Sequence, residues 1–311
     1  MRKFLIAAAA TVLLAACSNA DSGTATADTA TKTSNTVKEA ASGSSKTYNK
    51  AAKFDGAKLD AILKAQPEKA QARYGARNPA KTLEFFGIKP GMAVGEALPG
   101  GGWYTKILVP YLGEDGKLVG IDYSLDMWPE FSFANEQFIE SKKNWPAEFV
   151  SKAAEWAPAD GAKMSATTFG DAPGEKAGSL DAVIFIRALH NLSRFESEGQ
   201  YMTQALANTH AMLKPGGIVG VVQHSAPESA EDSWAVGSAG YLKQSKVVEA
   251  FEAAGFKLIK KSGVNANPKD VPTGDDVVWR LPPSLRGSDE TKDARMAIGE
   301  SNRMTLLFKK L

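Results

Sequence analysis

Runs of apolar residues alternate with longer amphipathic stretches along most of this chain. Short runs rich in apolar and β-branched side chains predict strands at residues 92–98, 117–122, 163–169, 181–187, 218–223, 256–261 and 303–309. The run DAVIFIR at 181–187 has no polar residue between its ends, as expected for a strand that is buried on both faces. The pattern therefore predicts a sheet covered by helices on both sides.

Helical patterns lie between and before the predicted strands. Helices are expected at residues 103–112, 196–213 and 246–254, with one or two more inside 123–156. Ahead of the strands, Leu59, Ile62 and Leu63 share one helical face, and a further helix is expected over 80–86. Because strands and helices alternate, we predict one α/β domain over residues 51–311. It has a Rossmann-like, mostly parallel seven-stranded sheet with helices on both faces and an N-terminal helical extension.

One connection, from about residue 263 to 302, is unusually long. Long connections inside compact domains usually carry function or are disordered. Order is favoured by Trp279, by the run Leu281-Pro282-Pro283 and by a helical pattern at 292–298. We therefore expect an ordered flap.

The N-terminal residues have the pattern of a targeting segment. A basic start, Met1-Arg2-Lys3, precedes an apolar run at 4–16 that is too short to span a bilayer. The run ends in Leu14-Ala15-Ala16-Cys17, which resembles the bacterial lipoprotein signal. The resemblance implies a signal peptide at 1–16, a lipid on Cys17 and, with Ser18 in place of Asp, an extracytoplasmic location at the outer membrane. The alternative is an ordinary secretory signal in which Cys17 stands by chance.

Composition separates a tether from the domain and excludes some kinds of partner. Residues 17–50 are mostly Ser, Thr, Ala, Asp and Gly, too polar and too small to fold alone, so a flexible tether is expected. The whole chain is 43% hydrophobic and 23% charged, as in ordinary globular proteins. Its net charge of +2 offers no basic excess for nucleic acid. Cys17 is the only cysteine, so we predict neither a disulfide nor a metal site.

A glycine-rich turn joins the first predicted strand to the helix that follows it. Gly100, Gly101 and Gly102 stand at this junction, where glycines let a ligand approach the backbone and the helix N-terminus offers free N–H groups. Asp122 ends the second predicted strand, twenty residues after Gly102, where a carboxylate commonly accepts hydrogen bonds from ribose. The pattern predicts a nucleotide-type site, and the alternative is a turn that only redirects the chain.

An acidic residue before the glycines narrows the choice of ligand. Glu96 lies at the strand end, and a carboxylate there suits a cationic cofactor without pyrophosphate better than it suits NAD. The series Glu96-x-x-x-Gly100-x-Gly102 is similar to motif I of class I S-adenosylmethionine (SAM) methyltransferases, although Leu98 replaces one usual glycine. The resemblance extends over about residues 80–311 and implies the class I methyltransferase fold with SAM as cofactor.

Further segments carry the same resemblance. They are Gly170-Asp171-Ala172 after the third predicted strand and the turn LKPGG at 213–217. The motif PGGGWYT at 99–105 and the pair His190-Asn191 are similar to a group of predicted bacterial methyltransferases, lipoproteins among them. The cofactor-binding residues that the resemblance implies are Glu96, Gly100, Gly101, Gly102, Trp103, Tyr104, Asp122, Tyr123, Asp171 and Arg187.

Three polar residues at the ends of the fourth and fifth predicted strands are the catalytic candidates. His190 can act as a base and Asn191 can orient an acceptor, while His224 ends the next strand on the same edge. The alternative for His190 is a capped loop in which its ring binds the backbone. Arg187 is charged at the end of an apolar strand, so we expect it to have a carboxylate partner or a ligand.

Two functions remain open after these observations. The first is a SAM-dependent methyltransferase that acts on a small molecule. The second is a non-catalytic extracytoplasmic lipoprotein that holds an adenosine-like or other ligand, because SAM is made in the cytoplasm whereas the signal directs the chain outside. A nicotinamide oxidoreductase is disfavoured by Glu96 and by the lack of a Gly-x-Gly-x-x-Gly series.

Overall fold

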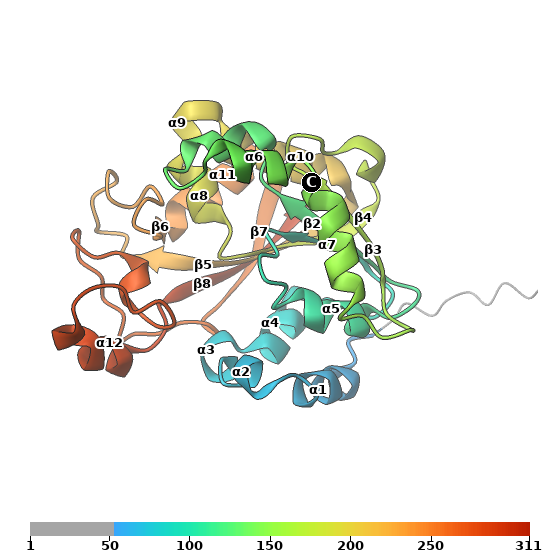
Figure 1. Cartoon of the computed structure of the whole chain (residues 1–311), viewed down its shortest axis with the longest axis horizontal. Helices are drawn as coiled ribbons and strands as arrows, with labels where there is room; N and C mark the ends of the chain where they lie inside the picture. Colours follow the sequence, from blue (N-terminus) through green and yellow to red (C-terminus); the bar gives the residue numbers. More distant parts are fainter. Residues whose placement is uncertain (1–52) are drawn as a thin grey trace, which may run out of the picture. The chain divides into compact units, whose positions relative to one another are not determined.

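A mostly parallel sheet runs through residues 53–311, the part of the chain that the computed structural model describes (Figure 1). The predicted signal peptide, Cys17 and the tether lie outside these residues. The strands are β1 (Ala93–Ala97), β2 (Lys117–Asp122), β3 (Lys163–Thr168), β4 (Leu180–Ile186), β5 (Leu213–Ala226), β6 (Leu242–Lys243), β7 (Phe256–Ser262) and β8 (Arg303–Lys310). Among residues 53–311, no helix is long and apolar enough to cross a membrane.

The strand order identifies the fold. It runs β3-β2-β1-β4-β5-β8-β7, and the short β6 pairs with the end of β5. The pairs from β3 to β5 are parallel, whereas β8 is antiparallel to both β5 and β7. This is the Rossmann-like arrangement of class I methyltransferases, so the predicted fold class is confirmed.

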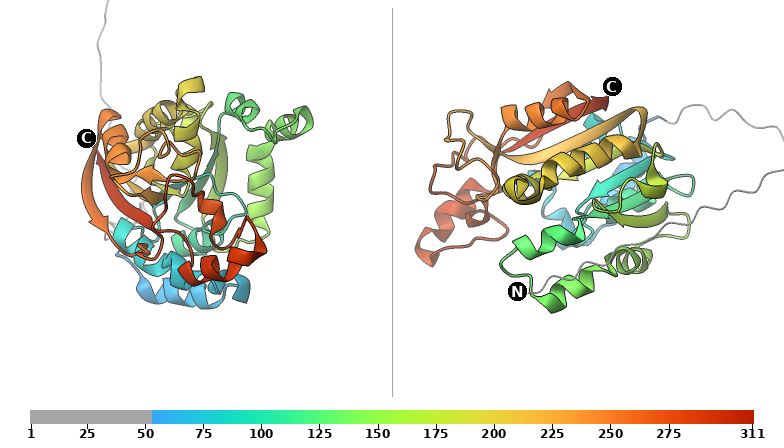
Figure 2. Two further views of the ribbon diagram at one scale, coloured as in Figure 1. Left: turned by 90° about the vertical axis from the view of Figure 1, so that its left-hand side faces the viewer. Right: turned by 90° about the horizontal axis from the view of Figure 1, so that it is seen from above.

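Helices cover both faces of the sheet (Figures 1 and 2). One face packs Val94 of β1 against apolar side chains of α1, α4 and α5. The other packs Ala93 and Ala97 against α8, α10 and α11. The helices are α1 (Gly56–Lys64), α2 (Glu68–Gln71), α3 (Tyr74–Arg77), α4 (Pro79–Phe86), α5 (Thr105–Leu112), α6 (Glu136–Lys142), α7 (Trp145–Ala154), α8 (Leu189–Arg194), α9 (Glu196–Gly199), α10 (Tyr201–Met212), α11 (Gln244–Ala253) and α12 (Lys292–Ile298).

Most element boundaries differ by one or two residues from the sequence-based expectation, and two elements differ more. The helix predicted at 196–213 is divided, because Gln200 adopts a left-handed φ of 54° between α9 and α10. The strand predicted at 218–223 begins earlier, at Leu213, and carries a bulge that shifts its register against β4 between Leu180 and Ala182. Hydrophobic periodicity signals neither a single left-handed residue nor a bulge, so these interruptions escape it.

The long connection after β7 is ordered, as predicted. It contains the 3₁₀ turns η3 (Val278–Arg280) and η4 (Asp289–Thr291), and α12 spans the residues of the predicted helix. The backbone N–H of Ser225, near the end of β5, donates to the Asn302 carbonyl at 3.0 Å. The flap therefore lies at the end of the sheet toward which β5 points (Figure 1).

Close packing of α4 on the sheet depends on a glycine in β5. A Cβ added to Gly220 would lie 2.5 Å from Phe86 Cδ2, and Phe86 is buried. We predict that Gly220→Ala lowers the free energy of unfolding by about 1–3 kcal/mol, because the ring has no room to move away. Urea denaturation followed by circular dichroism measures this change.

The matched control is Gly75→Ala in α3, where an added Cβ meets nothing within 4 Å. This change should leave stability the same or raise it slightly, since alanine favours a helix over glycine. Equal losses in the two variants would contradict the packing argument.

Candidate functional site

Four strand ends meet around one cavity of about 560 Å³. Leu98 follows β1, Arg187 follows β4, His224 lies near the end of β5 and Arg303 begins the antiparallel β8, directly opposite His224. The cavity therefore lies where the strand order reverses between β1 and β4, the usual ligand position in open α/β sheets. Its remaining walls come from α3 and the residues before it, the glycine turn and the flap.

The glycine turn opens onto this cavity. Gly100 and Gly101 line it, and a Cβ added to Gly101 would meet nothing within 4 Å, so the backbone there is accessible to a ligand. Gly102 has a different role, because a Cβ at that position would lie 2.1 Å from the Trp156 ring. Trp103 also lines the cavity, and the guanidinium carbon of Arg77 lies 4.7 Å from the centre of its ring.

Two cavity residues carry backbone strain. Leu98 has φ 54° and Arg187 has φ 59°, both in the left-handed region that favours glycine. Leu98, which replaces a glycine of the motif that this segment resembles, thus has a conformation that glycine adopts easily. Strained residues of this kind cluster at ligand sites, where the surrounding fold holds them in place.

Glu96 does not line the cavity. Its side chain is buried, and its carboxylate accepts a hydrogen bond of 2.7 Å from the Thr105 hydroxyl at the start of α5. Burial raises the pKa of Glu96 to about 7, against the opposing effect of Thr105. The carboxylate thus ties β1 to α5 beneath the turn.

Asp122 stands at the end of β2, as predicted, but its carboxylate already has a partner. Lys142 Nζ of α6 lies 3.0 Å from Asp122 Oδ2, and this ammonium also lies 4.1 Å from the centre of the Trp128 ring. Burial raises the pKa of Asp122, and Lys142 opposes that rise. A ribose would therefore have to share the carboxylate with Lys142 or displace it.

Several other predicted residues lie away from the cavity. Asn191 donates a hydrogen bond of 2.9 Å to the Tyr123 hydroxyl, and Tyr123 packs in the core against Trp128. Tyr104 is buried beside Trp103. Asp171 is exposed and accepts a hydrogen bond of 2.7 Å from the Thr168 hydroxyl.

The two histidines predicted to be catalytic both line the cavity, and their ring centres lie 5.8 Å apart. Burial, and then the charge of Arg187, lowers the pKa of His190 to about 4. Burial, and then Arg303, lowers the pKa of His224 well below its usual value, and its Nδ1 lies 2.5 Å from the Ser301 hydroxyl. Both rings are neutral at pH 7. Within residues 53–311, no cluster of three or more potential metal ligands exists.

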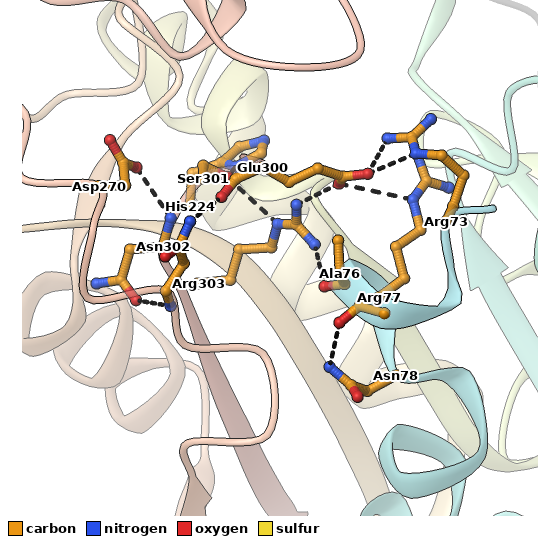
Figure 3. A network of polar contacts seen from close by, with 12 residues as sticks. Arg73, Ala76, Arg77, Asn78, His224, Asp270, Glu300, Ser301, Asn302 and Arg303 are labelled. Carbon is orange, nitrogen blue, oxygen red and sulfur yellow. Dashed lines mark hydrogen bonds and ion pairs between the residues drawn. The ribbon is translucent and has the colours of Figure 1, made fainter. Parts of the chain in front are cut away.

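The cavity wall contains a charged network that the sequence did not predict (Figure 3). Arg73 Nε donates to Glu300 Oε1 at 2.5 Å, Arg303 also pairs with Glu300, and Arg77 Nε lies 3.8 Å from the same carboxylate. Of these residues, Arg77, Glu300 and Arg303 line the cavity. The one available signal was Arg303, a charge at the start of a buried strand.

Known proteins resemble this chain only distantly. No protein-family model and no curated protein matches the chain. A SAM-dependent methyltransferase from Aquifex aeolicus is 16% identical, with a TM-score of 0.44 over 83% of this chain and 100% of that chain. The [4+2]-cyclase SpnF is 17% identical, with a TM-score of 0.49 over 76% of this chain and 80% of that chain.

A third solved structure contains a cofactor product. It is the 1,6-didemethyltoxoflavin-N1-methyltransferase of Burkholderia thailandensis with bound 1,6-didemethyltoxoflavin and S-adenosylhomocysteine. It is 12% identical, with a TM-score of 0.40 over 78% of this chain and 81% of that chain. At such identities the likeness concerns the fold alone, so the site of this chain has to be judged on its own residues.

The raised pKa of Glu96 predicts a pH-dependent stability. A protonated Glu96 is stable in the core, and its contribution is lost as the pH rises through about 7, because the buried carboxyl then ionises. Glu96→Gln keeps the shape without the charge. We expect this variant to be more stable than the parent at pH 8–9, by up to about 3 kcal/mol, and to lose this advantage near pH 5.

Thermal unfolding between pH 5 and 9 measures the effect. Glu114→Gln, at an exposed turn position, is the control and should follow the parent at every pH. A pH profile of Glu96→Gln parallel to that of the parent would show that Glu96 does not titrate in this range.

Proposed function

We propose that this protein is a SAM-dependent methyltransferase that acts on a small-molecule acceptor. The observation that carries the proposal is the cavity at the β1–β4 switch point, into which the backbone of Gly100 and Gly101 opens beside His190 and His224. The volume of about 560 Å³ is that of a small-molecule site. The methyltransferase strand order and Asp122 at the end of β2 agree with the proposal.

The residues present fit this cofactor in part. Gly101 leaves open backbone at the turn, whereas Asp122 at the end of β2 does not line the cavity and its carboxylate is paired with Lys142. When bound, SAM would supply an activated methyl group for transfer to the acceptor. The protein would contribute by holding the acceptor in the orientation for displacement, and such positioning supplies most of the rate acceleration. His190 and His224 line the cavity and are neutral at pH 7, but their lowered pKa values make both rings weak bases, so they suit an acceptor that loses its proton easily.

The second candidate is a non-catalytic ligand-binding protein of the same fold. The ion pair between Lys142 and Asp122 favours it, because this pair satisfies the carboxylate that a ribose would need. The predicted export signal favours it as well, since SAM is a cytoplasmic product. Ligands released from the purified protein and identified by mass spectrometry separate the two. SAM or S-adenosylhomocysteine supports the methyltransferase, whereas an unrelated ligand supports the second candidate.

We predict that the protein binds SAM and that Asp122 contributes to the affinity. Asp122→Ala should weaken binding by about 1–3 kcal/mol, because it removes the ribose hydrogen bonds. Isothermal titration calorimetry measures this loss. Lys142→Met is the control, since it frees the carboxylate and should leave the affinity equal or higher. Folded protein without SAM binding would refute the proposed cofactor, and full affinity in Asp122→Ala would refute only the ribose contact.

We also propose that Cys17 carries a lipid that holds the domain at the periplasmic face of the outer membrane. The support is the series Leu14-Ala15-Ala16-Cys17, followed by Ser18.

Fractionation of cells that express the full chain provides the test. Cys17→Ser should move the protein from the membrane fraction to the soluble fraction, because a single hydroxyl cannot accept the lipid. Ser18→Asp should keep the protein on a membrane but shift it from the outer to the inner one. A Cys17→Ser protein that remains in the membrane fraction would contradict lipid anchoring.

A further inference from the structure

The cavity wall carries more positive than negative charge. Four cationic side chains line it, against the single carboxylate of Glu300; they are Arg77, Lys106, Arg187 and Arg303. His190 and His224 are neutral and do not change this balance. Arg77 and Arg303 are buried and Lys106 and Arg187 half-buried, so an anion that enters the cavity would be attracted by this excess of positive charge.

Glu300 does not serve these arginines equally. Its carboxylate pairs with Arg73 and Arg303 (Figure 3). Arg77 Nε lies 3.8 Å away, beyond hydrogen-bond distance, and this buried atom has no hydrogen-bond partner. The carboxylate of Glu300 therefore pairs closely with Arg73 and Arg303 and leaves Arg77 Nε without a hydrogen bond.

The side chain of Arg187 is half-buried and lines the cavity. Its guanidinium enters no hydrogen bond and no ion pair among residues 53–311, whereas its backbone N–H donates to the Val222 carbonyl. Arg187 also stands on a strained backbone with φ 59°, where a glycine would fit more easily. Strained residues that carry a charge inside a cavity are typical of ligand sites.

Burial and mutual repulsion lower the pKa values of the cavity arginines. Burial, followed by the repulsion of Arg187, lowers the pKa of Arg77 to about 9. Burial, followed by the repulsion of Arg303, lowers the pKa of Arg187 to about 10. Both guanidinium groups remain charged at pH 7. In addition, Trp103 Nε1, a donor on another cavity residue, is buried without a partner.

We propose, on the basis of the function above, that Arg187 and Arg77 bind a carboxylate or phosphate group of the methyl acceptor. The acceptor is therefore a small organic acid. Guanidinium groups present paired N–H donors that match either anion. Trp279, Leu281 and Pro282 of the flap give the cavity an apolar wall for the body of the same molecule. His190 lies in the same cavity, so the anion positions the acceptor beside the candidate base.

The probes are inorganic phosphate and benzoate, which represent the two anionic groups. We expect saturable binding by calorimetry and a rise in melting temperature with probe concentration. Arg187→Met should weaken binding at least tenfold, and Arg187→Lys should weaken it less. Arg194→Met is the control, because Arg194 is exposed on α8, contacts the ring of Phe195 and does not line the cavity. The stronger of the two probes identifies the acidic group.

A second arm of the experiment adds saturating SAM. Anion binding that persists with SAM supports an acceptor site. Loss of anion binding on adding SAM would assign the arginines to the cofactor's own carboxylate and overturn the proposal. SAM binding without any Arg187-dependent anion binding, in variants that melt as the parent does, would also overturn it. Anion binding without SAM binding would instead remove the methyltransferase function and with it the acceptor role.

Discussion

The shared carboxylate of Glu300 holds together parts of the chain that are distant in sequence. It joins Arg73 and Arg77, at the N-terminal helices, to Arg303, at the start of β8. Burial alone would raise the pKa of Glu300, but the guanidinium groups of Arg303, Arg73 and Arg77 lower it below its ordinary value. Because one carboxylate pairs with several guanidinium groups, this network forms part of the cavity wall and leaves an excess of positive charge there.

The sheet topology determines where that charge can act. The parallel strands β1 and β4 end side by side, and the antiparallel β8 begins at the same edge. Leu98 and Arg187, the two strained residues at this edge, continue β1 and β4 into the cavity. The edge therefore combines accessible backbone from the glycine turn, neutral imidazoles and uncompensated guanidinium groups within one small volume.

Local sequence patterns predicted the parts of the fold that depend on local physics. β2 has the predicted bounds, and α12 has the bounds of the predicted flap helix, because periodicity reflects burial directly. The charged wall was not predictable in the same way. Arg73 and Glu300 are separated by 227 positions, and no spacing rule connects an arginine of an N-terminal helix to a glutamate before the last strand. The histidines and glycines were found because each follows a predicted strand.

The state of Asp122 bears most directly on the cofactor. A ribose hydroxyl is neutral, so replacing the Lys142 ammonium at this carboxylate exchanges an ion pair for hydrogen bonds and gains less than binding to a free carboxylate would. The displaced ammonium still has the Trp128 ring, which lies 4.1 Å away, and retains part of its stabilisation there. The need to compete with Lys142 makes Asp122 a weaker anchor than an unpaired carboxylate would be. The glycine turn and the residues that follow β4 must then supply a larger share of any ligand's binding free energy. Among these residues, the guanidinium group of Arg187 can contribute most to binding an anion.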